Sequence, residues 1–572
     1  MLKTRMLALA TAALLAGCSE APETSTDAAA AAPAAAEPPA ASGFTDAEVA
    51  SAIGTLSVDR YATYVETLAS DEFGGRAPFS KGEELTLDYL ESRFRELGIG
   101  PGNGESYQQP VSLVALTATP DGSMTVSAPD GDYELAYGDQ VVTWTKRVVE
   151  NVALEDSELV FVGYGIVAPE YGWDDYAGID MAGKTAVILV NDPGFATRDD
   201  AVFNGRAMTY YGRWTYKFEE AARQGAAGAL VIHETDAAGY PWEVVSGSWT
   251  GPQFDVASEN DRADRVAIEG WVTQAVAERF FEGREENLAA ISERAAQPGF
   301  EPVPLGIGVS TALSNTIKRS ESANVLARIP GSERPDEHFV FMAHWDHLGS
   351  VFSGEDRVFN GAVDNATGTA ALLELAHAFS ALPRAPKRSI LFLAVTAEES
   401  GLLGSAYYAE NPVYPTNQTV AGINMDAMNV IGPTNDIVVV GYGSSELEDL
   451  LAEAAEAQGR SLVPEPTPEK GYFYRSDHFS FAKQGVPVLF AEGGDDIRDQ
   501  EPGFGAEAAR DYVANRYHKP GDEFDSSWDL TGTVEDMELY FKVALAVADG
   551  DDWPEWYEGN EFKAARDADL AP

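Results

Sequence analysis

The chain has 572 residues, of which 45% are hydrophobic and 10% aromatic, and its formal net charge is −53 at pH 7. Its length predicts two or three domains, and its composition is that of a folded, soluble protein. The negative charge argues against nucleic acid and anionic membrane surfaces as main partners, because both would repel it. Such a charge is typical of a solvated acidic surface, although it would also attract a cationic group such as the amino end of a peptide.

The chain begins with a predicted export signal. Lys3 and Arg5 precede an apolar stretch, residues 6–15, that is too short to span a membrane. Leu-Ala-Gly-Cys follows, ending at Cys18, and this sequence resembles the processing site of bacterial lipoproteins. Residues 1–17 would then be removed and Cys18 would carry the lipid, whereas an ordinary secretory signal is the alternative.

The lipoprotein resemblance also implies a location. Cys18 is the single cysteine of the chain, so no disulfide can form within it. Ser19 follows, as in lipoproteins sent on to the outer membrane, which implies a protein that faces the periplasm or the cell surface. The lipid would be the only attachment to the membrane. Residues 18–43 are rich in Ala and Pro and are predicted to form a disordered tether.

A globular pattern begins at residue 44. Two helices are predicted over residues 59–70 and 82–97, and Leu90 and Phe94 lie on the apolar stripe of the second, which Gly98 ends. We expect this section, up to residue 116, to pack as a layer against a domain further along the chain.

Residues 117–319 are predicted to form a separate β-rich module with a few helices. Its apolar strand-like runs cover residues 158–163, 185–190 and 228–233. The module has no group of His, Cys and acidic residues at the spacing of metal ligands. His233 and Glu234 are the nearest candidates, and we interpret them as a solvated strand end.

Residues 320–550 alternate strand-like and helical runs, which predicts an α/β fold with a mixed, mostly parallel sheet sandwiched by helices. The predicted strands are residues 324–329, 338–343, 389–396, 421–425, 437–440 and 486–491, and the predicted helices are residues 368–382, 403–409 and 445–458. This domain would be completed by residues 44–116 and interrupted by residues 117–319. Residues 551–572 would form a C-terminal tail.

Two adjacent glutamates, Glu398 and Glu399, directly follow the predicted buried strand at residues 389–396. Carboxylates are almost never fully buried without a partner, so this pair is not expected to belong to the core. Neighbouring side chains at a strand end point in different directions. One carboxylate could therefore bind a metal ion while the other faces the water beside it.

Other acidic and histidine residues lie at the ends of the neighbouring predicted strands or in late loops: His344, Asp346, Asp364, Asp426 and His518. In an open α/β sheet, ligands gather beyond the carboxyl ends of the strands. Histidine with carboxylate suits zinc, and a carboxylate can bridge two ions. Three carboxylate ligands and one basic carboxylate would balance the charge of two Zn²⁺, which lower the pKa of bound water to roughly 7.

On these motifs, residues 44–116 and 320–550 resemble the secreted double-zinc aminopeptidases, the metallopeptidase family that also holds glutamate carboxypeptidase II and the glutaminyl cyclases. The resemblance implies two Zn²⁺ and peptide substrates. It implies that His344 and Asp426 bind the first zinc, that Asp364 bridges both, and that Glu399 and His518 bind the second.

The same resemblance implies the catalytic roles. Glu398 would be the general base, and Tyr517 would donate a hydrogen bond to the oxyanion. We interpret Asp346 as a carboxylate that orients the imidazole of His344. The family often has a cis peptide bond after the bridging aspartate, here between Asp364 and Asn365.

The β-rich module at residues 117–319 resembles the protease-associated domain often inserted in this family. The likeness is carried by residues 160–165, 174–178, 183–184 and 226–229. It implies a non-catalytic role as a lid or as a gate for substrate.

The remaining histidines are interpreted as structural. His347 is expected to be a wall residue beside the site, His338 and His377 to be part of the scaffold, and His478 to line the pocket without binding metal.

An aminopeptidase has three alternatives. His344 argues against a glutaminyl cyclase, which usually lacks the first-zinc histidine. A carboxypeptidase or dipeptidase needs a cation for the substrate carboxylate, and Arg475 and Arg516 leave that possibility open. A metal-free, receptor-like binding protein of the same fold is the third alternative.

Overall fold

The computed structural model describes residues 43–350 and 358–571. The predicted signal, tether and lipidation site at Cys18 lie outside the described residues. From Thr45 onward these residues form one compact unit. No helix among them is long and apolar enough to cross a membrane.

A mixed sheet forms the centre of residues 320–550. Its strands are β13 (Val303–Ile329), β14 (Arg334–His344), β17 (Arg388–Val395), β18 (Thr419–Asn424), β19 (Asp436–Val439), β20 (Ser461–Pro464) and β21 (Val488–Gly493). Strands β17, β14, β18 and β21 lie side by side and run parallel. Strands β13 and β19 pair antiparallel at either side of this group. The predicted mostly parallel sheet is confirmed.

Helices cover both faces of this sheet. Alternate residues of β14 point to opposite faces, because successive side chains on a strand alternate. Phe341 packs on Phe379 of α10 (Thr367–Ser380), which packs on Phe541 of α15 (Thr531–Asp549). On the other face, Val340 and Met342 share a cluster with residues of α11 (Leu403–Glu410) and α13 (His478–Ala482). The predicted helix sandwich is therefore present.

The N-terminal helices are α1 (Asp46–Ile53), α2 (Val58–Leu68) and α3 (Lys81–Glu96). Ser80 caps α3 by accepting hydrogen bonds from the backbone amides of Gly82 and Glu83. Helix α2 contacts α10, and α3 contacts β13, so this section packs onto the central sheet as expected.

A second set of strands lies between these parts of the chain: β3 (Met124–Ser127), β4 (Tyr133–Leu135), β5 (Val141–Trp144), β6 (Asn151–Phe161), β9 (Thr185–Leu189), β10 (Gly228–His233) and β12 (Ile268–Thr273). Helices α4 (Pro193–Thr197), α5 (Trp214–Arg223), α6 (Thr235–Ala238), α7 (Trp242–Ser248), α8 (Gln274–Phe280) and α9 (Leu288–Ala295) accompany them. Alternate residues of β9 belong to separate apolar clusters on the two sides of these strands.

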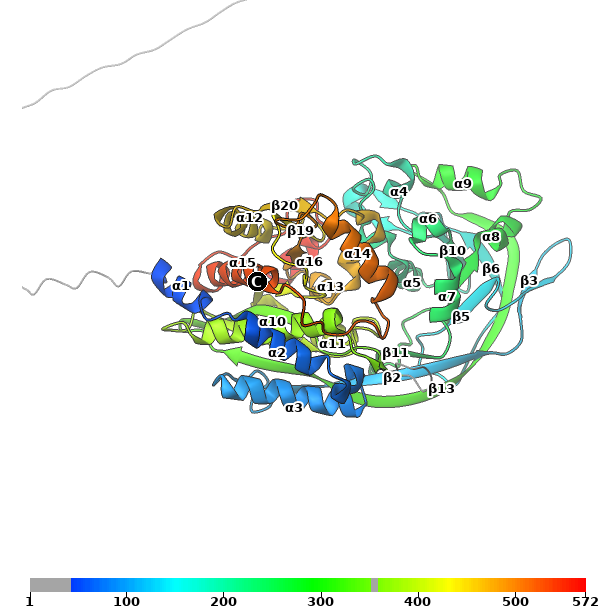
Figure 1. Ribbon diagram of the computed structural model, residues 1–572. Helices are drawn as coiled ribbons and strands as arrows, with labels where there is room; N and C mark the ends of the chain where they lie inside the picture. Colours follow the sequence, from blue (N-terminus) through cyan, green and yellow to red (C-terminus); the bar gives the residue numbers. More distant parts are fainter. Residues whose placement is uncertain (1–42, 351–357, 572) are drawn as a thin grey trace, which may run out of the picture. The chain divides into compact units, whose positions relative to one another are not determined.

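The long strand β13 joins the two sets of strands (Figure 1). Its first part pairs with β6, and its last residues pair with β17. Between them it pairs with β2 (Gln108–Pro120) from Leu313 to Val325. The predicted domain boundary near residue 117 falls inside β2, and the boundary near residue 319 falls inside β13. The backbone hydrogen bonds between these two strands therefore continue across both boundaries.

The end of the chain packs onto the main body. Trp556 is buried and donates from Nε1 to the backbone oxygen of Gly485. Arg566, in α16 (Lys563–Asp569), is also buried and donates to the backbone oxygens of Thr419 and Val420. The last described residues are thus held by tertiary contacts.

Candidate metal centre

The predicted ligands come from loops at one edge of the central sheet. His344 is the last residue of β14, Glu398 and Glu399 follow β17, and Asp426 follows β18. Because these strands are parallel and adjacent, their carboxyl ends lie at the same edge. Asp364 lies in the turn that precedes α10.

Two turns orient the carboxylates. The peptide bond between Asp364 and Asn365 is cis, as the family resemblance implied. The Asn365 side chain donates to the backbone oxygen of Met425 and accepts from the amide of Ala427, which ties this turn to the loop that carries Asp426. Ala397 has a positive φ of 53°, and the chain turns there before Glu398.

His344, Asp364 and Asp426 form the first half of the centre. His344 Nε2 lies 3.1 Å from Asp426 Oδ1 and 3.3 Å from Asp364 Oδ1. Ser476 donates from Oγ to the other oxygen of Asp426 at 2.5 Å. One carboxylate oxygen of Asp364 and one of Asp426 therefore lie beside the same nitrogen, Nε2 of His344.

Asp364, Glu399 and His518 form the second half. His518 Nε2 lies 3.2 Å from Asp364 Oδ2 and 3.0 Å from Glu399 Oε2. Asp364 thus offers Oδ1 to the first half and Oδ2 to the second. The structure brings all five predicted metal ligands together, with Asp364 between the halves as a bridging ligand would be.

His347 contacts the predicted ligand Glu399, which the sequence did not lead us to expect. Its Nδ1 lies 2.5 Å from Glu399 Oε1, the oxygen that does not face His518. His347, Asp364 and Glu399 also form a group whose donor atoms all lie within 4.8 Å of one another. His347 therefore contacts a predicted ligand of the second half directly. Its place three residues after the predicted ligand His344 is the feature of the sequence that could have pointed to this contact.

The ionisable side chains of this centre lie close together and are largely buried. Burial raises the pKa of Glu398 well above its usual range, and the charges of Asp426 and Glu399 raise it further. Burial would lower the pKa of His518, but hydrogen bonds to Asp364 and Glu399 raise it to about 10. Hydrogen bonds from His344 and His518 outweigh burial and lower the pKa of Asp364. The imidazoles of His344 and His518 therefore stabilise the charged form of the Asp364 carboxylate between them.

Glu398 differs from its neighbour Glu399 in position. Its side chain is 12% exposed, and its Oε2 lies 3.9 Å from His344 Nε2, farther than the carboxylates of Asp364 and Asp426. It therefore stands beside the group of donor atoms and is free to exchange a proton with a bound molecule.

Asp346 and Tyr517 flank the centre. The backbone oxygen of Asp346 lies 3.1 Å from His344 Nδ1, whereas its carboxylate oxygen Oδ1 is 3.8 Å away. That carboxylate instead accepts from the backbone amide of Glu398. The main chain of Asp346 orients the imidazole, and its side chain positions the Glu398 turn. Tyr517 is half-exposed, and its ring stacks on His518 at 3.9 Å.

Buried residues behind the ligands fix these loops. Arg76 is fully buried and donates to the backbone oxygens of Trp345, Asn360 and Gly361. Asp522 accepts from the backbone amides of Val363 and Asp364. Neither residue was predicted, because nothing local in the sequence relates them to loops that lie at least 158 residues away.

The donor set fits a pair of zinc-type divalent ions. Imidazole nitrogens and carboxylate oxygens are donors that Zn²⁺ takes, and a carboxylate with one oxygen toward each half is a suitable bridge. The buried carboxylates would be costly without cations to balance them. Fold and site together give two adjoining candidate metal sites at the carboxyl edge of an α/β sheet.

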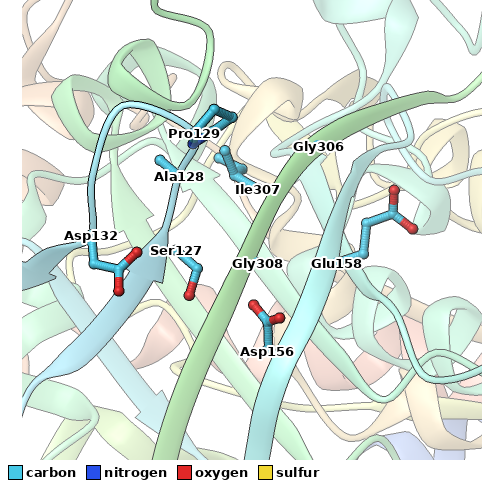
Figure 2. Close-up of a pocket in the computed structure, with 9 residues that line it drawn as sticks. All are labelled: Ser127, Ala128, Pro129, Asp132, Asp156, Glu158, Gly306, Ile307 and Gly308. Carbon is cyan, nitrogen blue, oxygen red and sulfur yellow. The ribbon is translucent and has the colours of Figure 1, made fainter.

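A hollow elsewhere does not share these features. It has a volume of about 350 Å³ and lies among Ser127, Asp132, Asp156, Glu158 and Gly308 (Figure 2). Glu158 is paired with Lys184 at 2.7 Å, and no histidine or cysteine lines the hollow. The hollow offers carboxylate oxygens, but it lacks the combination of carboxylates and imidazoles that the metal centre has.

Residues 324–542 match the model of peptidase family M28. This segment carries all the predicted ligands, so the likeness to that family covers the candidate metal centre. The aminopeptidase NAALADL1 of Mus musculus is 36% identical over 137 residues, which are 23% of this chain and 17% of that protein. A probable zinc metalloprotease of Pyricularia oryzae is 32% identical over 158 residues, 28% of either chain. The chain thus spans well under two thirds of these relatives.

Among solved structures, an aminopeptidase from Aneurinibacillus sp. strain AM-1 is 19% identical, with a TM-score of 0.45. The likeness covers 87% of this chain and 96% of that one. A zinc aminopeptidase from Bacillus subtilis is 15% identical, with a TM-score of 0.40, over 89% of this chain and 97% of that one.

Proposed function

We propose that the protein is a zinc-dependent exopeptidase that hydrolyses N-terminal residues from peptides. The observation that supports this most is the arrangement of Asp364 between two groups of donors, with Glu398 standing beside them. A structural metal site would use its carboxylates as ligands and would have no need of an additional basic carboxylate.

The residues then have distinct roles in hydrolysis. Two zinc ions, held by His344, Asp426, Asp364, Glu399 and His518, would polarise the scissile carbonyl and lower the pKa of the attacking water. Glu398 accepts a proton from that water and later gives it to the nitrogen of the leaving amine. Tyr517 donates a hydrogen bond to the oxyanion. Asp346 holds the backbone amide of Glu398 and so keeps the base in place.

Two further observations support action at amino ends. The chain carries 92 acidic against 39 basic residues, so it attracts a cationic amino group. The mouse relative and both solved structures named above are aminopeptidases by their own descriptions.

A panel of peptides tests the proposal. Peptides with free amino ends should be cleaved, and the same peptides with acetylated amino ends should not. Cleavage of blocked peptides from the carboxyl end would instead make the protein a carboxypeptidase. A purified chain that holds no zinc, and binds none when zinc is added, would favour a receptor-like protein.

Substitution of the base tests the mechanism. We expect Glu398→Gln to keep both zinc ions, because Gln has the same shape and Glu398 is not a ligand, and to lose turnover by at least about 100-fold. Zinc content by elemental analysis and kcat on an aminoacyl substrate are the measurements. A variant that keeps its turnover would show that Glu398 is not the base.

A further inference from the structure

Three segments that are far apart in the sequence meet beside α13. They are the turn at residues 208–210, the loop at residues 471–476 and the segment at residues 556–562, which we call the strap. Their side chains share one apolar cluster, whose buried members are Met208, Val440, Phe473, Tyr474, Phe479, Ala482, Trp556 and Phe562. The ring centre of Phe562 lies 6.1 Å from that of Phe473. The strap therefore packs against the loop and, through the shared cluster, against the turn.

Glu561 of the strap joins the other two segments by hydrogen bonds. Its Oε1 accepts from the backbone amide of Tyr210 at 3.0 Å and from the hydroxyl of Tyr474 at 2.7 Å. The same hydroxyl lies 3.1 Å from the backbone oxygen of Met208. Among the described residues, no lysine, arginine or histidine nitrogen lies within 4.0 Å of this carboxylate. One carboxylate oxygen is thus the common acceptor for the turn and the loop.

The loop continues directly into the metal centre. Ser476 donates from Oγ to Oδ2 of Asp426 at 2.5 Å. The loop is packed closely on the turn, because a Cβ atom at Gly471 would lie 2.6 Å from Sδ of Met208. Tyr474 stands two residues before Ser476, so the hold of the strap on the loop reaches a predicted metal ligand.

The surroundings of Glu561 oppose its ionised form. Burial raises its pKa to about 7, although the hydrogen bonds from Tyr474 and Tyr210 act in the opposite direction. The charges of Asp192 and Glu170 raise this pKa further. An ionised carboxylate in this place has no cation to balance it, so the contact is firmest while the carboxyl group is protonated. The titratable groups near it are Glu170, Tyr171, Asp192, Tyr211, Tyr474 and, beside Asp192, Lys217.

We propose that the strap holds the loop against the turn, with Glu561 as the positioning residue, and that ionisation of Glu561 loosens this hold. The strap then makes the position of Asp426, and with it the first half of the metal centre, sensitive to pH. The region between residues 117 and 319 takes part, because Met208 and Tyr210 belong to it. The effect on hydrolysis rests on the proposed exopeptidase function, whereas the hold itself does not.

The kinetics of Glu561→Gln and Glu561→Ala test the effect on hydrolysis. Gln accepts the same hydrogen bonds and cannot ionise, so kcat/KM of this variant on an aminoacyl substrate should equal that of the wild type at pH 6. At pH 8.5 it should exceed the wild type by roughly 3- to 10-fold, the effect of one or two hydrogen bonds. The ratio should change around pH 7, where Glu561 loses its proton. Glu561→Ala should lie below the Gln variant at both pH values, by a similar factor.

Glu558→Gln is the matched control, because Glu558 lies in the same segment, its side chain is 92% exposed and its partner is Lys563. This variant should follow the wild type at every pH. A ratio of Glu561→Gln to wild type that does not change with pH would overturn the role of ionisation. A Glu561→Ala variant as active as the Gln variant would overturn the positioning role.

Amide hydrogen exchange tests the hold without any turnover. Mass spectrometry follows fragments that contain residues 205–212 and 471–478, with rates corrected for the intrinsic effect of pH. In the wild type both fragments should lose protection between pH 6 and pH 8.5, in Glu561→Gln they should keep it, and in Glu561→Ala they should lack it at both. This pattern in a protein that cleaves no peptide would refute the proposed function and support the strap. Equal protection in all three proteins would overturn the strap whatever the activity.

Discussion

The two oxygens of Glu399 have different partners, and this difference affects how firmly the second half of the centre is held. Oε2 faces His518 and the bridging Asp364, while Oε1 is held by His347. The ring of His347 is fully buried and lies against Gly361, where a Cβ atom would clash with it. We therefore interpret His347 as the residue that positions Glu399, rather than as a passive part of the wall.

Removing the imidazole of His347 should weaken the second metal site selectively. We expect His347→Ala to lower zinc affinity there by roughly 10- to 100-fold, the usual effect of removing a partner of a metal ligand. The first site should keep its affinity, because His344 and Asp426 do not contact His347. Titration against a competing chelator resolves the two affinities.

His377→Ala is the matched control, since His377 lies on α10 away from the ligand loops. Two unchanged affinities in His347→Ala would contradict the positioning role. Failure of the second site to fill even in saturating zinc would instead make His347 a ligand.

Among the strands, β14 carries both a ligand and a titratable core residue. His344 ends the strand, and His338 lies within it, 1% exposed and stacked on Tyr414 at 4.1 Å. Burial lowers the pKa of His338 to about 4, and the charge of Arg328 contributes. The element that positions the site therefore depends on a neutral histidine.

This histidine predicts a pH dependence of stability. Its folded-state pKa of about 4 lies below the usual 6.5, so the unfolded chain takes up the proton first. The contribution of His338 to the free energy of unfolding is therefore fully present above pH 6.5, and it is lost as the pH falls toward 4. Relative to His338→Phe, which keeps an aromatic ring on Tyr414, the wild type should lose roughly 2 kcal/mol between pH 7 and pH 5.

Urea unfolding of both proteins at the two pH values measures this difference. Other buried groups titrate in both proteins and cancel in the comparison. Parallel losses in wild type and variant would mean that His338 is protonated in the folded state.

For the whole molecule, the net charge of −53 bears on how the protein can attach to a membrane. So acidic a protein gains nothing from contact with anionic lipid, and no helix of the described residues is apolar enough to span a membrane. We propose that the lipid on Cys18 is the attachment to the membrane and that the protein is an exported lipoprotein, although Cys18 lies outside the described residues.

Substitution of this cysteine tests the attachment. In a bacterial host, the wild type should sediment with the membranes, resist a wash in high salt and be released by detergent. Cys18→Ser removes the group that carries the lipid, so the variant should appear in the soluble fraction. Wild-type protein that is soluble, or a variant that stays with the membranes, would refute the lipid attachment.

Local patterns in the sequence were sufficient for part of this structure. The apolar runs at residues 338–343 and 389–396 predicted strands that the structure contains as β14 and β17, with ends that differ by a few residues. The acidic and histidine residues that follow such runs could be assigned to one edge, because parallel strands end there. The family resemblance then supplied their roles and the cis bond at Asp364.

The tertiary structure decided what depends on residues far apart in the chain. Strand β13 was expected only at residues 324–329, because its remaining pairing with β2 and β6 joins segments about 140 to 215 residues apart and leaves no local apolar run. The contact of His347 with Glu399 and the anchoring of the loops by Arg76 are of the same kind. Each depends on side chains that approach one another only after the sheet and its loops have assembled, so the sequence determined the donors and the fold determined their partners.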